Sequence, residues 1–143
     1  MRVLFVDDEP EGLALTTRLL REVLGATVDV VPTVEAAVAA LHGAPYDLVV
    51  TDLFIPLGAR PREILGPRSR RYAENLQHLG GLILLDELAL LAHRPKVLAH
   101  TACTDFALLD VLQGVVDGKI PKPAPPDVLL KAVLEALELP VPG

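Results

Sequence analysis

The sequence lacks the features that would place it outside the cell or in a membrane. It contains one cysteine, Cys103, which excludes an intrachain disulfide and suits a reducing compartment. No apolar run approaches the roughly 20 residues of a membrane span. The apolar run after Arg2 is interrupted by acidic residues too early for a signal peptide. We therefore predict a cytoplasmic protein with no membrane partner.

Positive charge is also scarce. The chain has 13 lysines and arginines against 19 aspartates and glutamates, a net charge of -6. Because nucleic-acid backbones are bound by clustered lysine and arginine, this balance disfavours nucleic acid as a direct partner. The content of 51% hydrophobic and 22% charged residues is typical of a globular chain. The length predicts one domain over residues 1–143.

Short apolar runs alternate with helical patterns, which predicts βαβ units and a doubly wound α/β fold with a mostly parallel sheet. The expected strands are residues 3–6, 27–31, 48–51, 97–99 and 119–120. The expected helices follow Pro10 and Thr33, then cover about 81–92 and 105–116, and the last one starts after Pro125-Pro126 and runs to about 139. Gly25 is a plausible C-cap for the first helix, and Thr33 a plausible N-cap for the second.

Polar residues follow the apolar strands at the points where the strands end. Asp7 and Asp8 follow the first strand, Asp52 the third, Thr101 the fourth and Lys122 the fifth. If the strands are parallel, these ends open at one edge of the sheet, where open α/β sheets bind ligands. Carboxylate oxygens suit Mg²⁺, and a carboxylate can attack a phosphoryl group when the developing charge is neutralised. The pattern therefore predicts a site for phosphate and magnesium chemistry.

This constellation resembles the CheY-like receiver domain of two-component response regulators, over nearly the whole chain. The resemblance implies a flavodoxin-like five-stranded parallel sheet in the order 2-1-3-4-5, with helices on both faces. It identifies Asp52 as the phosphoacceptor. It also implies that Mg²⁺ is held by Asp7, Asp8 and Asp52 together with the backbone carbonyl of Phe54.

Three more residues match the family pattern. Thr101 resembles its hydroxyl switch residue, Lys122 its lysine, and Pro56 the proline after the phosphoacceptor. The Lys122-Pro123 bond is expected to be cis. The implied function is a signalling switch, phosphorylated on Asp52 by a histidine kinase or phosphotransfer protein. It would signal by contact with a downstream protein target, with a homodimer as one option. It would not be an enzyme beyond self-catalysed phosphotransfer and autodephosphorylation.

Two features depart from that family. Residues of about 57–79 form an arginine-rich insertion with five arginines and two glutamates, a net charge of +3 in a chain of -6. It is expected to be either a solvated loop or a lid or docking element. Lys119 occupies the position of the family's relay aromatic, so we predict that Lys119 is exposed and that the usual aromatic relay is absent.

Two alternative functions stay open. A haloacid-dehalogenase-like phosphatase would carry its nucleophile on the first strand in an Asp-x-Asp pattern, which Asp7-Asp8-Glu9 lacks. A receiver-like interaction module that is never phosphorylated would be compatible with Lys119 and the long insertion. His100 is interpreted as a core histidine with its hydrogen bonds satisfied. In the last helix, Leu130, Leu134 and Leu137 form a second apolar stripe, which either is exposed for association or widens a buried face.

Overall fold

The computed structural model describes residues 1–53, 80–102 and 115–139. The strands are β1 (Arg2–Val6), β2 (Thr27–Val31), β3 (Leu48–Thr51), β4 (Lys96–Thr101) and β5 (Gly118–Pro121). The helices are the 3-10 helix η1 (Pro10–Leu13) and the α-helices α1 (Ala14–Leu24), α2 (Val34–Gly43), α5 (Gly80–Ala89) and α7 (Pro126–Ala136). All strand pairs are parallel and their order is β2-β1-β3-β4-β5, as predicted.

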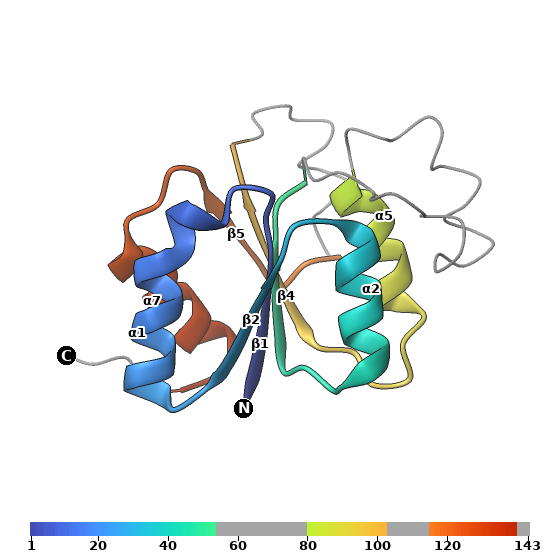
Figure 1. Cartoon of the computed structure of the whole chain (residues 1–143), viewed down its shortest axis with the longest axis horizontal. Helices are drawn as coiled ribbons and strands as arrows, with labels where there is room; N and C mark the ends of the chain where they lie inside the picture. The colour runs from blue at the N-terminus through green and yellow to red at the C-terminus, as the bar shows by residue number, and fades with distance from the viewer. Residues whose placement is uncertain (54–79, 103–114, 140–143) are drawn as a thin grey trace.

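The helices cover both faces of the sheet, with α1 and α7 on one side and α2 and α5 on the other (Figure 1). Alternation along β1 divides the core accordingly: Val3 and Phe5 pack on the α1/α7 side, and Leu4 and Val6 on the α2/α5 side. All residues of the central strand β3 are buried. Burial of a valine or leucine side chain, such as those of Leu48, Val49 and Val50, stabilises the fold by about 1.5–3 kcal/mol.

Both predicted helix caps are confirmed. The Thr33 hydroxyl accepts a hydrogen bond from the backbone N–H of Ala36 at 3.0 Å, at the start of α2. Gly25 ends α1 in the left-handed conformation with φ 62°. Short polar and glycine residues are favoured at these positions because they satisfy or tolerate the special backbone there.

Two helices end earlier than predicted. The helix α5 stops at Ala89 rather than Ala92, because the N–H groups of Leu90 and Leu91 bond to carbonyls three residues back and tighten the turn. The helix α7 stops at Ala136 rather than Leu139, since Glu138 adopts a positive φ of 58°.

A third helix boundary also needs correction. The helix expected at 105–116 lies mostly outside the described residues, but its expected last residue, Val116, is in a β-bridge.

The second apolar stripe of α7 belongs to the core. Leu134 is buried, and Leu130 and Leu137 pack against the cluster on the α1/α7 side. A broad face that packs against the core therefore explains the stripe. Across the described ranges, no helix is both long enough and apolar enough to span a membrane.

Candidate functional site

The backbone of the candidate site continues the hydrogen-bond ladder of the sheet. The N–H groups of Asp7 and Asp52 donate to the carbonyls of Val31 and Val6, at 3.0 and 3.1 Å. The N–H of Lys122 donates to the carbonyl of Thr101 at 3.1 Å. Each charged residue is thus fixed to a neighbouring strand immediately after its own strand ends. The predicted convergence at the carboxyl edge is confirmed for these residues.

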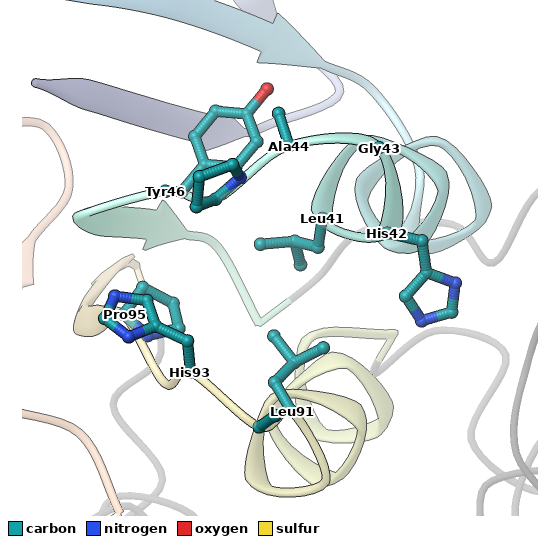
Figure 2. Close-up of a pocket in the computed structure, with 10 residues that line it drawn as sticks. Leu41, His42, Gly43, Ala44, Tyr46, Leu91, His93 and Pro95 are labelled. Carbon is teal, nitrogen blue, oxygen red and sulfur yellow. The ribbon is translucent and has the colours of Figure 1, made fainter.

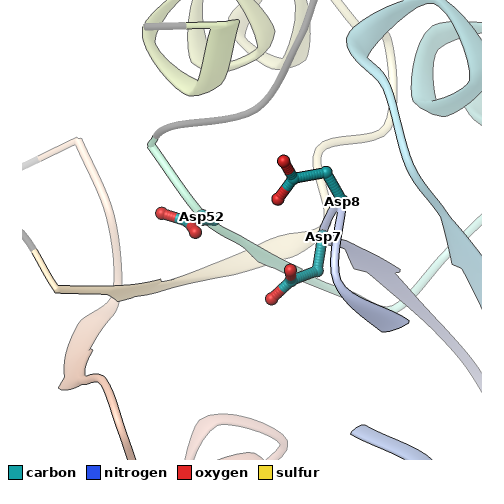
Figure 3. A group of neighbouring side chains, drawn as sticks. All are labelled: Asp7, Asp8 and Asp52. Carbon is teal, nitrogen blue, oxygen red and sulfur yellow. The ribbon is translucent and has the colours of Figure 1, made fainter. Parts of the chain in front are cut away.

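Three carboxylates meet at this edge. One oxygen from each of Asp7, Asp8 and Asp52 can be chosen so that all three lie within 4.8 Å of one another (Figure 3). Asp7 and Asp52 are buried, whereas Asp8 is exposed. Hard oxygen donors at this spacing, one of them open to solvent, fit the preference of Mg²⁺ for a few carboxylates and several waters.

Lys122 connects two of the carboxylates. Its Nζ lies 2.7 Å from Oδ2 of Asp7 and 2.8 Å from Oδ2 of Asp52. Burial alone would lower the pKa of Lys122, but the hydrogen bonds and charges of Asp52 and Asp7 outweigh it and raise that pKa above its ordinary value. The lysine therefore stays charged and neutralises part of the buried acidic cluster.

The same contacts define the role of Asp7. Its Oδ1 accepts a hydrogen bond from the N–H of Glu9 at 2.9 Å, and its Oδ2 accepts from Lys122. The sequence predicted that Lys122 lies at the same sheet edge as the acidic residues, but not that its ammonium pairs with both Asp7 and Asp52. Asp7 and Asp52 are each the first residue after their strand. No sequence pattern specifies that one ammonium reaches both carboxylates.

The remaining predicted residues are placed as follows. Thr101 is buried at the end of β4, opposite Pro121 in register. Lys119 is exposed, and the Lys122-Pro123 bond is cis, both as predicted. Phe54, Pro56 and the arginine-rich segment 57–79 lie outside the described residues.

His100 differs from its interpretation as a satisfied core histidine. Its side chain is buried, with the residue 6% exposed, and its Nε2 has no hydrogen-bond partner within the described parts of the chain. Burial, followed by the nearby charge of Lys122, lowers the pKa of His100 in spite of the opposing charges of Asp7 and Asp52. The imidazole is therefore neutral near pH 7. The signal in the sequence was a polar residue inside an otherwise apolar run.

A cavity of about 330 Å³ lies beside the site. It contacts residues from β4, the loop after β1, η1 and the loop after β5. Its lining residues are Asp7, Glu9, Gly12, Leu13, His100, Ala102, Lys122, Pro123 and Ala124. The site thus has a carboxylate side, built by the three aspartates, and a cavity side that includes neither Asp8 nor Asp52.

A second cavity, of about 430 Å³, lies at the opposite edge of the sheet, between the ends of α2 and α5. Figure 2 shows Leu41 and Leu91 projecting toward the space between these helices. Tyr46 closes one side and donates a hydrogen bond to Asp29 at 2.6 Å. Desolvation by burial, followed by that bond, raises the pKa of Tyr46 to about 12. This cavity shares no residue with the carboxylate site.

Solved structures similar to this chain include receiver domains. A CheY-like response regulator receiver domain from Methanospirillum hungatei matches with TM-score 0.73 and 22% identity, covering 96% of this chain and 93% of that one. The non-phosphorylated HemR receiver domain from Leptospira biflexa matches with TM-score 0.70 and 23% identity, covering 99% and 98%. The receiver domain of a Pseudomonas aeruginosa sensor histidine kinase, with magnesium coordinated in its active-site cleft, matches with TM-score 0.70 and 20% identity, covering 96% and 97%.

Sequence comparison gives a shorter match. A segment of 56 residues, 39% of this chain, is 48% identical to the transcriptional regulatory protein TcrA of Mycobacterium tuberculosis. The match spans 22% of the length of that relative. No family model matches the chain. The sheet order, the arrangement of helices and the agreement with solved receiver domains lead to one conclusion: the chain has the fold of the CheY-like response regulator receiver domains.

Proposed function

We propose that the protein is a phosphorylation-dependent signalling switch in which Asp52 accepts a phosphoryl group. Asp7, Asp8 and Asp52 would hold Mg²⁺ with the backbone carbonyl of Phe54, and Thr101 and Lys122 would contact the phosphoryl group. The whole chain, residues 1–143, would act as one receiver domain with an arginine-rich insertion at about 57–79.

One observation carries this proposal. A buried carboxylate, Asp52, shares an ammonium with a second buried carboxylate and lies beside a third that is open to solvent, at the ligand-binding edge of a receiver fold. A structural ion pair needs only one acid for each lysine. The excess of negative charge instead suits a site that is completed by a cation.

The chemistry follows from these positions. A carboxylate oxygen of Asp52 forms a bond to phosphorus, the bond from phosphorus to the donor breaks, and the donor atom keeps the electron pair. Bound Mg²⁺ supplies charge neutralisation for the phosphoryl oxygens. The Lys122 ammonium lies 2.8 Å from Asp52 and would pair with the added phosphoryl group. Thr101 would donate a hydroxyl hydrogen bond to one of its oxygens.

The donor would be a phosphohistidine on a histidine kinase or phosphotransfer protein. The phosphorylated form would signal by contact with a downstream protein, alone or as a homodimer. Because Lys119 is exposed, the contact surface would change without the rotation of a buried aromatic at that position.

A small acyl phosphate tests the proposal without a partner. The protein is incubated with acetyl phosphate and Mg²⁺, and the modified residue is mapped by mass spectrometry. We expect a phosphoryl group on Asp52 that requires Mg²⁺ and is absent in Asp52→Asn. The Asp29→Asn variant serves as a control at an acid within β2 that belongs to none of the site's carboxylates, and it should be modified on Asp52 like the wild type.

The same experiment separates the alternatives. Modification of Asp7 or Asp8 instead of Asp52 would support a phosphatase that uses the first strand. Absence of both modification and Mg²⁺ binding would favour an interaction module that is never phosphorylated.

A further inference from the structure

The strand β2 lies at one edge of the sheet and pairs only with β1 among the described strands. The backbone groups of Thr27 and Val31, at the two ends of β2, bond to residues that flank β1, at 2.9 and 3.0 Å. Because alternate residues of a parallel ladder face the same neighbour, Val28 and Val30 present their N–H and C=O groups to the outside. An open strand edge of this kind is a template for pairing with another strand.

Arg21 covers one of these outward groups. It lies in the last turn of α1, and its Nη2 donates a hydrogen bond to the carbonyl of Val28 at 2.7 Å. Among the described residues Arg21 has no ion pair, whereas Arg18 of the same helix pairs with Glu22 at 3.0 Å. The guanidinium of Arg21 is therefore directed at the strand edge and not at an acidic neighbour.

The outward groups of β2 are complementary to those of a second β2. Two such strands related by a two-fold axis can run antiparallel with Val28 opposite Val30 of the other copy, and each opposed pair then exchanges two N–H···O=C bonds. In this register the carbonyl of Val28 accepts from the N–H of Val30 in the other copy. That carbonyl is the acceptor that Arg21 occupies. Pairing in this register therefore requires Arg21 to move away.

Asp29 opposes the same pairing through its charge. It lies between the two valines, so the register places it directly opposite Asp29 of the other copy, and like charges in that position are destabilising. The Tyr46 hydroxyl donates a hydrogen bond to the Asp29 carboxylate at 2.6 Å and holds it in place.

We propose that the β2 edge is a pairing surface for a second copy of this chain, and that Arg21 keeps it closed as an autoinhibitory contact. When the guanidinium leaves Val28, two copies join their sheets edge to edge, and Asp29 limits how tightly they do so. The surface contains none of the three site carboxylates, so this association is independent of phosphoryl transfer.

Analytical ultracentrifugation of the full-length protein, without Mg²⁺ or a phosphodonor, measures the association apart from any effect of Asp52. We expect Arg21→Ala to dimerise about tenfold more tightly than the wild type, because the Val28 carbonyl is released. Adding Asp29→Asn should tighten that dimer about threefold more. The matched control is Arg18→Ala, which removes an exposed arginine from the same helix and should associate like the wild type.

Two further measurements assign the dimer to β2. Val30→Pro removes an outward N–H without removing a bond to β1, and it should return the Arg21→Ala variant to the association of the wild type. Hydrogen exchange gives a readout that does not depend on the folding of the proline variant. In the Arg21→Ala dimer, the amides of Val28 and Val30 should exchange about tenfold more slowly than in the monomer. Circular dichroism and the urea unfolding midpoint establish that each variant is folded.

Three results would overturn the proposal. The first is a folded Arg21→Ala variant that associates no more than the wild type, which would make the Val28 contact only a link between helix and strand. The second is a dimer in which the amides of Val28 and Val30 exchange as fast as in the monomer, which would place the interface on another surface. In the third, Arg18→Ala dimerises as strongly as Arg21→Ala, and loss of positive charge would then drive the association.

Discussion

At the scale of single residues, Lys122 is the group on which the acidic site depends. Its ammonium compensates two buried carboxylates at 2.7 and 2.8 Å, while Asp8 adds a third negative charge nearby. Like charges this close raise the free energy of the folded state unless a cation offsets them. The metal-free protein therefore relies on the lysine, and added metal ions should partly replace it.

We expect Lys122→Met to lower the free energy of unfolding by about 2 kcal/mol in the absence of Mg²⁺, because two buried acids lose their counter-charge. Added Mg²⁺ should stabilise the variant more than the wild type. Urea unfolding with and without Mg²⁺ measures both effects. The control is Lys119→Met, which replaces an exposed lysine in β5, the strand that ends just before Lys122. It should alter the free energy of unfolding by less than about 0.5 kcal/mol. Equal stability of the two variants would contradict the assigned role of Lys122.

At the scale of secondary structure, local signals decided most of the element boundaries. Thr33 began α2 because its hydroxyl satisfies the N–H of Ala36, and Gly25 ended α1 because its backbone has a positive φ. The ends of α5 and α7 were predicted less well. Apolar residues continue past both ends, and tightened or left-handed turns, which the spacing of apolar residues does not reveal, stop the helices.

The left-handed position gives a clean test. Gly25→Ala should lower the free energy of unfolding by about 1 kcal/mol, since Gly25 has φ 62° and a side chain is disfavoured there. No atom beyond the neighbouring residues lies within 4 Å of the added Cβ, so the cost comes from the local backbone conformation and not from a clash with the rest of the fold. Gly43→Ala is the matched control: its Cβ also meets no atom, its φ is not positive, and it lies in α2. We expect Gly43→Ala to be neutral or slightly stabilising in urea unfolding; equal losses in both variants would refute this explanation.

At the scale of the whole molecule, two groups make stability fall in alkaline solution. The raised pKa of Lys122 means that its contribution is complete below its unfolded pKa of about 10.4 and is lost as pH rises through its folded pKa. The pKa of Tyr46 is about 12 in the folded chain against about 10 unfolded, so the unfolded chain releases this proton first. Both effects favour unfolding as the pH rises.

We therefore expect the free energy of unfolding to decline above about pH 10, measured by urea denaturation at a series of pH values. Tyr46→Phe and Lys122→Met should each remove part of the decline. In a Tyr72→Phe background, the ultraviolet absorbance of the phenolate should place the Tyr46 transition at about pH 12. A transition near pH 10 would show that Tyr46 is not held by burial and Asp29 in solution.

The sequence predicted the sheet and its polar edge because both depend on short-range patterns. Apolar runs end in Asp7, Asp52 and Lys122, and parallel strands bring such ends together. The cavity could not be predicted in this way. It exists because residues distant in the sequence, among them Gly12 and Ala124, leave space beside His100 when η1 and the loop after β5 pack on the sheet. Periodicity carries no information about the volume left between packed elements.

The ladder bonds from Asp7, Asp52 and Lys122 have a consequence for protein engineering. Each N–H is bonded to a carbonyl at the end of a neighbouring strand, so the positions of these backbones depend on the sheet rather than on side-chain attraction. The edge is therefore a fixed frame whose chemistry can be exchanged. Replacing the carboxylates by imidazole or thiol groups should redesign the site for softer metals while the scaffold stays in place.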